Sequence, residues 1–365
     1  MRLVMTCFWI YALLFAIGCK NSNDSFAQKV DEKFENNEKT TSQKSNEELS
    51  VIIDGLNYRV NVDNHTAELV SCEKSVEIAI IPLQINFKGQ NYAVTKIGEK
   101  AFYGNINLKE IELSENIKQI GADAFFFCKS VKNIKIPAHV DSIGENAFSL
   151  CKGLNSITVS EQNINYVDLD GVLFTKNMNV LIQYPIGSER KNYTIPLGTE
   201  IIGRNAFDNS SNLISVTIPK SVKELGYQCF NGSSIRSLLI PGNVKKVDAG
   251  AFMLCKELKS LTIEDGVEEI GAGAFNSCTG LSHVVLPKSL TTIGENAFVN
   301  CALLQTIKCE AVSPPCLSTL SPDKGILVPK IISEFSDVCL LVPGSSVEQY
   351  KSALGWKEFK TIKSY

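Results

Sequence analysis

The strongest constraint on this chain is a motif of the form I-G-x-x-A-F that recurs along most of its 365 residues. Six residues after its phenylalanine, each copy continues as L-x-x-I-x-I. The phenylalanines lie 23, 23, 59, 23, 22, 23 and 23 residues apart; they are Phe102, Phe125, Phe148, Phe207, Phe230, Phe252, Phe275 and Phe298. A fixed period near 23 residues is typical of one unit that is copied and stacked, so we expect a solenoid whose neighbouring coils share a core.

One unit, residues 258–280, shows how such a coil is built. Leu258, Leu261 and Ile263 have the spacing of leucine-rich repeats and alternate with polar residues, which indicates a strand with one face in the core. A glycine then permits a tight bend, and Ala274 and Phe275 follow on an expected short helical turn. We therefore expect a repeat solenoid of the leucine-rich-repeat type, mainly β with short helical turns, in which the phenylalanines of successive coils stack.

The 59-residue spacing marks one modified coil, since it equals a normal period of 23 plus 36. Residues 160–195 hold the extra chain. Within them, the apolar segments 171–174 and 180–184 are separated by a turn candidate and predict a β-hairpin. This insert is either a landmark for binding or a tolerated elaboration of one coil. The solenoid itself is expected to span residues 97–312.

Both ends of a solenoid expose an apolar layer and need a cap. We assign residues 51–96 to the N-terminal cap, with a β-hairpin formed by 58–62 and 66–70 and a first solenoid strand at 78–81. The C-terminal cap is expected at 313–365. It should contain a last strand at 340–342, a short helix at 347–354, and two aromatic residues, Trp356 and Phe359, that close the core.

The first 19 residues predict export. Arg2 precedes an apolar stretch, residues 3–17, that has the length of a signal-peptide core and is short for a membrane span. The stretch ends Ala-Ile-Gly-Cys at Cys19, which resembles the lipid-modification site of bacterial lipoproteins; an ordinary cleaved signal or a retained anchor are the alternatives. Lipid on Cys19 would hold the protein at the outer membrane or the cell surface. Residues 20–50 are polar and predict a flexible tether.

Composition argues against several kinds of partner. The net charge is only −3, which gives no indication of nucleic-acid binding. The three histidines, His65, His139 and His283, are far apart in the sequence, and no C-x-x-C spacing indicates a thiolate site. No glycine-rich phosphate loop follows a strand. We therefore expect no metal and no cofactor.

Five of the twelve cysteines share one repeat position, three residues after the phenylalanine; they are Cys128, Cys151, Cys255, Cys278 and Cys301. Small polar residues hold the same position in three other coils: Asn105, Ser210 and Ser233. This exchange indicates a buried turn position where cysteine acts as a small hydrophobic residue, and we expect reduced thiols there, although coil spacing would permit a Cys255–Cys278 bond. The better candidates for one disulfide are Cys309, Cys316 and Cys339, near the C-terminal cap.

Solvent-facing strand positions of successive coils should form rows. One row is almost entirely small and polar: Glu110, Asn133, Ser156, Ser215, Ser237, Ser260, His283 and Thr306. Four of the eight residues in the neighbouring row are basic: Lys109, Lys132, Asn155, Ile214, Arg236, Lys259, Ser282 and Gln305. The sequence thus predicts a ligand surface on the strands, with Lys109, Lys132, Arg236, Lys259 and His283 as candidate contacts and acidic ligands as the first class to test. An ordinary solvated face is the alternative.

The repeated form G-E-x-A-F-x-x-C-x-x-L-x-x-I-x-I-P resembles that of the BspA-like leucine-rich repeat proteins of bacteria. It is seen at residues 144–154 and 294–301. The segments 170–174, 193–196 and 342–359 also match, so that the resemblance covers about residues 51–365. It implies a protein of the cell envelope or surface with a binding or adhesive role, and it brings no catalytic residues.

These observations lead to three functional hypotheses. The first is a non-enzymatic, lipid-anchored envelope protein whose repeat platform binds an extracellular protein or glycan. The second is a hydrolase of surface polymers that uses the solenoid as a scaffold, for which Ser260 beside His283 is the one candidate pair. That pair has no evident orienting carboxylate or oxyanion pocket, so we assign no catalytic residue. The third is a purely structural spacer.

Overall fold

The computed structural model describes residues 49–318, 331–332 and 337–365. The chain divides into two units, Met1–Glu48 and Leu49–Tyr365. The first unit lies outside the described residues, and with it the predicted signal peptide, the candidate lipidation site Cys19 and the predicted tether up to residue 48. None of the described helices has the length and apolar character of a membrane span.

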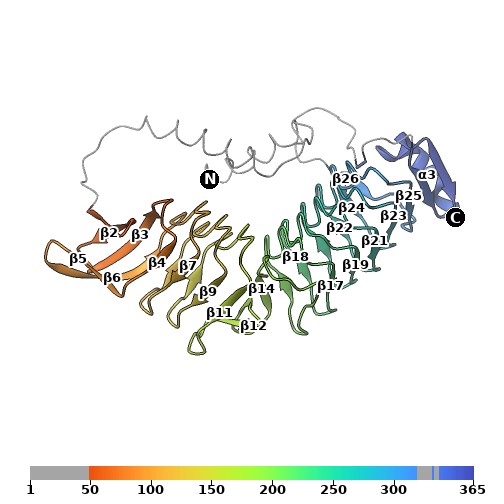
Figure 1. The fold of residues 1–365 in the computed structure, drawn as a ribbon. Helices are drawn as coiled ribbons and strands as arrows, with labels where there is room; N and C mark the ends of the chain where they lie inside the picture. Colours follow the sequence, from red (N-terminus) through yellow and green to blue (C-terminus); the bar gives the residue numbers. More distant parts are fainter. Residues whose placement is uncertain (1–48, 319–330, 333–336) are drawn as a thin grey trace. The chain divides into compact units, whose positions relative to one another are not determined.

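The second unit is a solenoid in which most coils give one short strand to each of two faces (Figure 1). The strand face holds β4 (Ile78–Ile80), β7 (Glu110–Glu112), β9 (Asn133–Ile136), β11 (Ser156–Val159), β15 (Asn192–Thr194), β17 (Ser215–Thr217), β19 (Ser237–Ile240), β21 (Ser260–Ile263), β23 (His283–Leu286), β25 (Thr306–Cys309), β27 (Cys339–Val342) and β28 (Thr361–Ser364). The opposite face holds β6 (Gln90–Ile97), β8 (Gln119–Ile120), β10 (Ser142–Ile143), β14 (Val180–Gln183), β16 (Ile201–Ile202), β18 (Glu224–Leu225), β20 (Lys246–Val247), β22 (Glu269–Ile270), β24 (Thr292–Gly294) and β26 (Cys316–Ser318).

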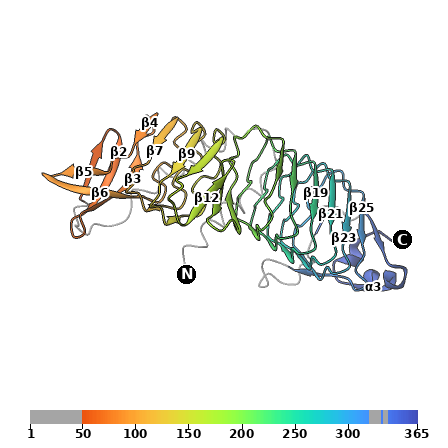
Figure 2. The same cartoon turned by 90° about the horizontal axis from the view of Figure 1, so that it is seen from below.

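Pairings between strands of consecutive coils are parallel on both faces, as a stacked coil requires. The strands of the strand face lie side by side in the view from below (Figure 2). Their residues alternate between exposed and buried, for example along β21 and β23, because successive side chains of a strand point to opposite sides. The predicted solenoid of leucine-rich-repeat type is confirmed.

The predicted phenylalanine ladder forms the centre of the core. Phe275 stacks on Phe252 and on Phe298, with ring centroids 5.3 Å apart in both pairs and nearly parallel planes. In the modified coil, Tyr184 takes the place of the phenylalanine and stacks on Phe207 at 4.9 Å. A single coil buries each ring only with help from its neighbours, so stability is shared between coils.

The expected helical turns are wrong. The segments around each repeat phenylalanine form consecutive hydrogen-bonded turns instead, for example from Ala124 to Gly121 and from Cys128 to Phe125. In both turns the third residue is left-handed, with φ of 54° at Asp123 and 62° at Phe127. Two left-handed residues within five positions interrupt any helix, and they are characteristic of type II turns.

The glycine of the I-G pair is required by close stacking. A Cβ atom on Gly294 would lie 2.3 Å from the backbone nitrogen of Ala272 in the preceding coil. No side chain fits at that distance, so glycine lets the coils stack at the corner after the second strand.

The modified coil contains the predicted hairpin and one strand more. β12 (Tyr166–Leu169) pairs antiparallel with β13 (Val172–Thr175), and β13 pairs antiparallel with β14. β14 also pairs in parallel with β16, so it is the coil's own second strand as well as an arm of the hairpin. Both faces are interrupted here, between β11 and β15 and between β10 and β14.

β13 lies between two hydrophobic cores. Leu173 packs into the core of the N-terminal coils, whereas Val172 and Phe174 pack into that of the C-terminal coils. The extra chain is thus the joint between two stacks of coils.

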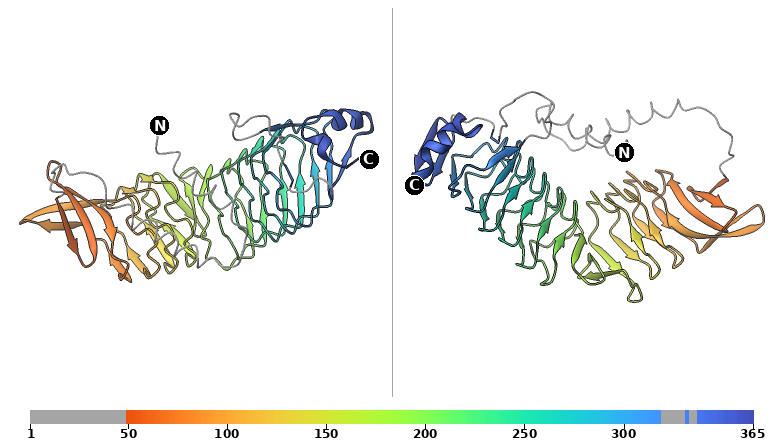
Figure 3. Two further views of the ribbon diagram at one scale, coloured as in Figure 1. Left: turned by 90° about the horizontal axis from the view of Figure 1, so that it is seen from above. Right: turned by 180° about the vertical axis from the view of Figure 1, so that it is seen from behind.

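The caps show how each end is covered (Figure 3). At the N-terminal end, β1 (Ser50–Ile53), β2 (Leu56–Asn61) and β3 (Thr66–Cys72) extend the sheet of β6, and β2 and β3 form the expected hairpin. β5 (Gln84–Phe87) forms a further hairpin with β6. The predicted first solenoid strand is β4, which pairs with β7.

At the C-terminal end, η1 (Gly344–Ser346), α3 (Val347–Ser352) and η2 (Trp356–Glu358) follow β27. The predicted helix is therefore present, and Trp356 and Phe359 are buried as expected. The expectation of β27 as the last strand is wrong, because β28 adds one more parallel strand beside it.

Candidate functional site

The registers of the strand face align its exposed residues into rows. In what we call the middle row, Asn192, Ser215, Ser237 and Ser260 lie opposite one another on successive strands, and His283 lies opposite Thr306. Two residues further along each strand is the inner row, in which Thr194 lies opposite Thr217 and Thr262 opposite Val285. The predicted small polar row is thus formed by the structure.

The basic row lies immediately before the strands, at what we call the rim. Backbone hydrogen bonds join its members from coil to coil: the amide of Lys259 donates to the carbonyl of Arg236, and that of Arg236 to Ile214. Ile214 in turn donates to Lys191, a residue that the sequence-based row omitted. Lys191 holds the rim position of the modified coil. Counting back from the predicted strand at 193–196 would have found it.

The strand face has a charge bias that the whole chain lacks. From β9 to β25, the rim, middle and inner rows comprise 24 positions, of which six hold Lys or Arg and none holds Asp or Glu. The six are Lys132, Lys135, Lys191, Arg236, Lys259 and Lys308. The full chain has 36 basic and 39 acidic residues, so this face is selectively depleted of acids.

Most of these cations have no acidic partner. Among the described residues, five of the six are absent from every ion pair, and only Lys308 is paired, with Glu310 at 2.7 Å. On the opposite face, by contrast, Lys223 pairs with Glu200 at 2.9 Å and Lys246 with Glu269 at 3.0 Å. The strand face therefore presents uncompensated positive charge, whereas these two lysines of the opposite face are paired with carboxylates.

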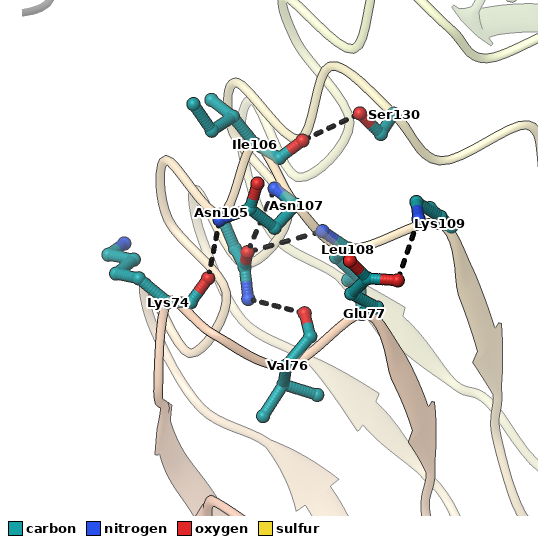
Figure 4. Close-up of polar contacts among 9 residues, drawn as sticks. All are labelled: Lys74, Val76, Glu77, Asn105, Ile106, Asn107, Leu108, Lys109 and Ser130. Carbon is teal, nitrogen blue, oxygen red and sulfur yellow. Dashed lines mark hydrogen bonds and ion pairs between the residues drawn. The ribbon is translucent and has the colours of Figure 1, made fainter.

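Lys109 differs from the other candidate contacts. Its ammonium lies 2.6 Å from the carboxylate of Glu77, and this pair stands beside the network in which Asn105 and Asn107 hold the preceding loop (Figure 4). Glu110 and Glu112 lie on the strand that follows it. The positive surface therefore starts at Lys132, and the acidic N-terminal coil marks its boundary.

His283 is exposed on the middle row next to Ser260. A serine–histidine pair needs a carboxylate to orient the imidazole. None of the 24 positions from β9 to β25 is acidic, so among them this pair has no third member of a triad. Nor do the described residues contain any group of three His, Cys, Asp or Glu side chains that could hold a metal ion.

The ladder cysteines are buried, as the repeat position predicts. Each thiol also points at the carbonyl oxygen of the phenylalanine in the preceding coil, at 3.2 Å from Cys278 to Phe252 and 3.1 Å from Cys255 to Phe230. Burial raises the pKa of the Cys128 thiol to about 12, so the neutral form is favoured there. This turn position therefore holds a small buried side chain, and serine fills it in two other coils, as Ser210 and Ser233.

The three cysteines near the C-terminal cap are not brought together. Cys309 ends β25 and its sulfur accepts a hydrogen bond from the Tyr350 hydroxyl at 3.2 Å. Cys339 begins β27, opposite Thr306, and Cys316 lies on the other face, in β26. All three are free thiols in the structure.

Comparison with known proteins decides the family. A model of the BspA-type leucine-rich repeat region matches residues 84–180 and 187–305, in six copies, which is more than half of the 365 residues. The chain belongs to the BspA-type leucine-rich repeat family. The first matched segment includes β12 and β13 of the modified coil, and only residues 181–186 lie between the two segments.

Solved structures agree on the fold of this BspA-type chain. A leucine-rich repeat protein from Eubacterium ventriosum is 21% identical, with a TM-score of 0.54, covering 81% of this chain and 94% of that protein. The pneumococcal vaccine antigen PcpA is 16% identical, with a TM-score of 0.51, covering 88% of this chain and 100% of that one. Among curated proteins, none matches.

Proposed function

We propose that this protein is a non-enzymatic, exported envelope protein, anchored by lipid at Cys19, whose strand face binds an extended acidic polymer outside the cell. The polymer is either a glycan or a protein. The observation that carries the proposal is the strand face itself, with six cations and no acid among the 24 positions of its three rows from β9 to β25. Membership of a repeat family is consistent with a scaffold that presents a surface.

The shape of the surface favours a long ligand over a small metabolite. Small molecules usually bind in concave apolar pockets. Two hollows of the described residues, of about 480 and 180 Å³, are lined by the N-terminal cap and by the joint, away from the basic rows. Parallel strands about 4.8 Å apart instead offer regularly spaced hydroxyl and amide groups with cations at the rim, which suits a repeating polymer.

Each contact with such a surface is weak alone. Exposed charge pairs contribute about 0–1 kcal/mol, so affinity must come from several lysines and arginines acting together. Many copies on one membrane would then add avidity. His283 would contribute a ring and a hydrogen bond within the row of hydroxyl groups.

The first test is binding of the purified protein to arrays of acidic and neutral glycans and of host proteins, followed by charge reversal. The double variant Arg236→Glu/Lys259→Glu should bind an acidic ligand about tenfold or more weakly, since two lost contacts of roughly 1 kcal/mol each act together. The matched control is Lys223→Glu/Lys245→Glu on the opposite face, which changes the net charge equally and should bind normally. Equal affinities of the two variants would contradict the proposal.

A further inference from the structure

One coil of the solenoid departs from the others in its core. The position six residues after the ladder aromatic, just before the rim, is a buried aliphatic residue in the other coils, as at Leu154, Leu213 and Leu258. In the modified coil this position is Arg190. Lys191 is hydrogen-bonded to Ile214, so these two residues hold the same repeat position, and the residues just before them, Arg190 and Leu213, correspond as well. Comparison with the regular coils thus shows that this position normally holds a buried aliphatic side chain.

Two further core positions of the same coil carry polar atoms. Tyr193 lies opposite the buried Val216 of the next coil, and Tyr184 replaces the ladder phenylalanine. The two rings meet edge to face with centroids 5.3 Å apart. Three positions that are apolar in the regular coils therefore bring a guanidinium and two phenol hydroxyls into one coil of the core.

The cluster lies against the joint. Arg190 donates from Nη2 to the main-chain carbonyl of Asp170 in the turn between β12 and β13, at 2.6 Å. Ser188 is buried, and its hydroxyl accepts the amide of Arg190 at 3.4 Å. Tyr184 is 1% exposed. The site lies at the interruption of the strand face, where Gly171 packs against Ser156.

The cluster has more donors and positive charge than it has partners. Nη1 of Arg190 and the hydroxyl of Tyr193 are buried and have no hydrogen-bond partner among the described residues. Arg190 is absent from every ion pair between described residues. Burial raises the pKa of Tyr193, with Arg190 opposing the shift and Tyr184 and Asp170 adding to it, which places these groups within each other's field. Nη1 is the buried edge of a side chain that is otherwise partly exposed, and a buried N–H without a partner is costly.

We propose that Arg190, Tyr193 and Tyr184 form a buried site for a small monovalent anion, a halide or a small carboxylate, at the joint between the two stacks. A phenol hydroxyl and a guanidinium N–H both donate, and an anion accepts from both while it balances the charge. A water molecule would also satisfy the donors, but it would add no charge contact to Arg190, which has no ion pair among the described residues. The anion would link β15, the following coil and the turn of the hairpin, so binding should stabilise the joint.

Thermal unfolding of the purified protein in sodium chloride and in sodium gluconate, at one ionic strength, tests the proposal. Because gluconate is too large to enter, chloride should raise Tm by at least about 2 °C through preferential binding to the folded state. Arg190→Leu and Tyr193→Val install the residues that the next coil holds at these positions and should abolish the difference. The control Lys220→Leu removes an exposed cation of the next coil and should keep it.

Two measurements keep the test decisive. If Arg190→Leu fails to fold, Tyr193→Phe takes its place as the test, because it removes one hydroxyl and keeps the ring. This variant should raise the apparent Kd for chloride at least about tenfold. Crystals grown in bromide should show one anomalous peak beside Arg190. If the native protein melts at the same temperature in both salts, or if the chloride effect persists in Arg190→Leu, the site does not bind an anion.

Discussion

Asp208 brings a carboxyl group to a repeat position that is occupied by neutral side chains in other coils. It follows the ladder residue Phe207, and in two other coils that position is Asn231 and Asn276, both buried. Its Oδ1 accepts hydrogen bonds from Asn231 and Asn209, each at 2.8 Å. Burial outweighs these two bonds and raises the pKa of Asp208 from 3.8 to about 7.

The raised pKa predicts a loss of stability as pH rises. Because the folded state binds the proton more tightly than the unfolded state, the contribution of Asp208 is full below pH 4 and is lost as pH rises through about 7. The loss is up to roughly 4 kcal/mol in the free energy of unfolding. Asp208→Asn should remove this pH dependence and melt higher than the native protein at pH 8.

Denaturant unfolding of both proteins between pH 4 and pH 8 checks this prediction. The control Glu257→Gln removes one charge from an exposed position two coils away and should leave the pH profile unchanged. If the free energy of unfolding of the native protein follows the same course from pH 4 to pH 8 as that of Asp208→Asn, burial does not raise the pKa of this carboxyl group.

At the scale of single residues, the sequence was most informative where the repeat is regular. The phenylalanine and cysteine positions could be read directly, since each recurs with the same neighbours. The exceptions lie in the modified coil. There Lys191, Arg190 and Tyr184 occupy standard repeat positions that the 59-residue spacing obscures, although counting back from the predicted strand at 193–196 aligns them.

At the scale of elements, the ladder of rings makes a quantitative prediction. Phe275 is fully buried between two other rings, so Phe275→Ala should lower the free energy of unfolding by about 3–5 kcal/mol through lost transfer energy and a cavity. Leu303 is 57% exposed, and Leu303→Ala should cost less than about 0.5 kcal/mol. Chemical denaturation of the two variants measures both values, and similar losses would mean that the coil register is wrong.

The strands were predictable and the turns were not, for a physical reason. Alternation of apolar residues marks a strand directly, and the expected strands at 58–62, 66–70 and 78–81 are present. The turn segment contains Ala-Phe, which favours a helix by propensity. The opposing signal is the residue two before the phenylalanine, which is left-handed in all eight coils. It is Lys100 or Gln228 in two of them and Asp, Asn or Gly in the other six. Asp, Asn and Gly tolerate positive φ best.

At the scale of the whole second unit, the two cores predict stepwise behaviour. The coils before and after the joint bury separate hydrophobic clusters that meet at β13. Repeat proteins are stabilised by nearest-neighbour contacts, so a defect should spread mainly within its own stack. Phe125→Ala should therefore speed amide hydrogen exchange in coils up to β11, and Phe275→Ala in coils from β15 onwards.

Hydrogen exchange read by mass spectrometry on peptides from both stacks checks this. Peptides from β9 should change only in Phe125→Ala, and peptides from β23 only in Phe275→Ala. Equal acceleration along the whole solenoid in both variants would show that the joint couples the stacks into one cooperative unit.

The central claim is that ligands are bound by the strand face. The most direct measurement is the acetylation rate of individual lysines in the purified protein with and without heparin, a sulphated glycan used as the acidic probe. Our account predicts several-fold protection of Lys132, Lys191 and Lys259 on the rim, and unchanged rates at Lys223 and Lys245 on the opposite face. Protection centred on Lys223 and Lys245, or spread evenly over both faces, would contradict it.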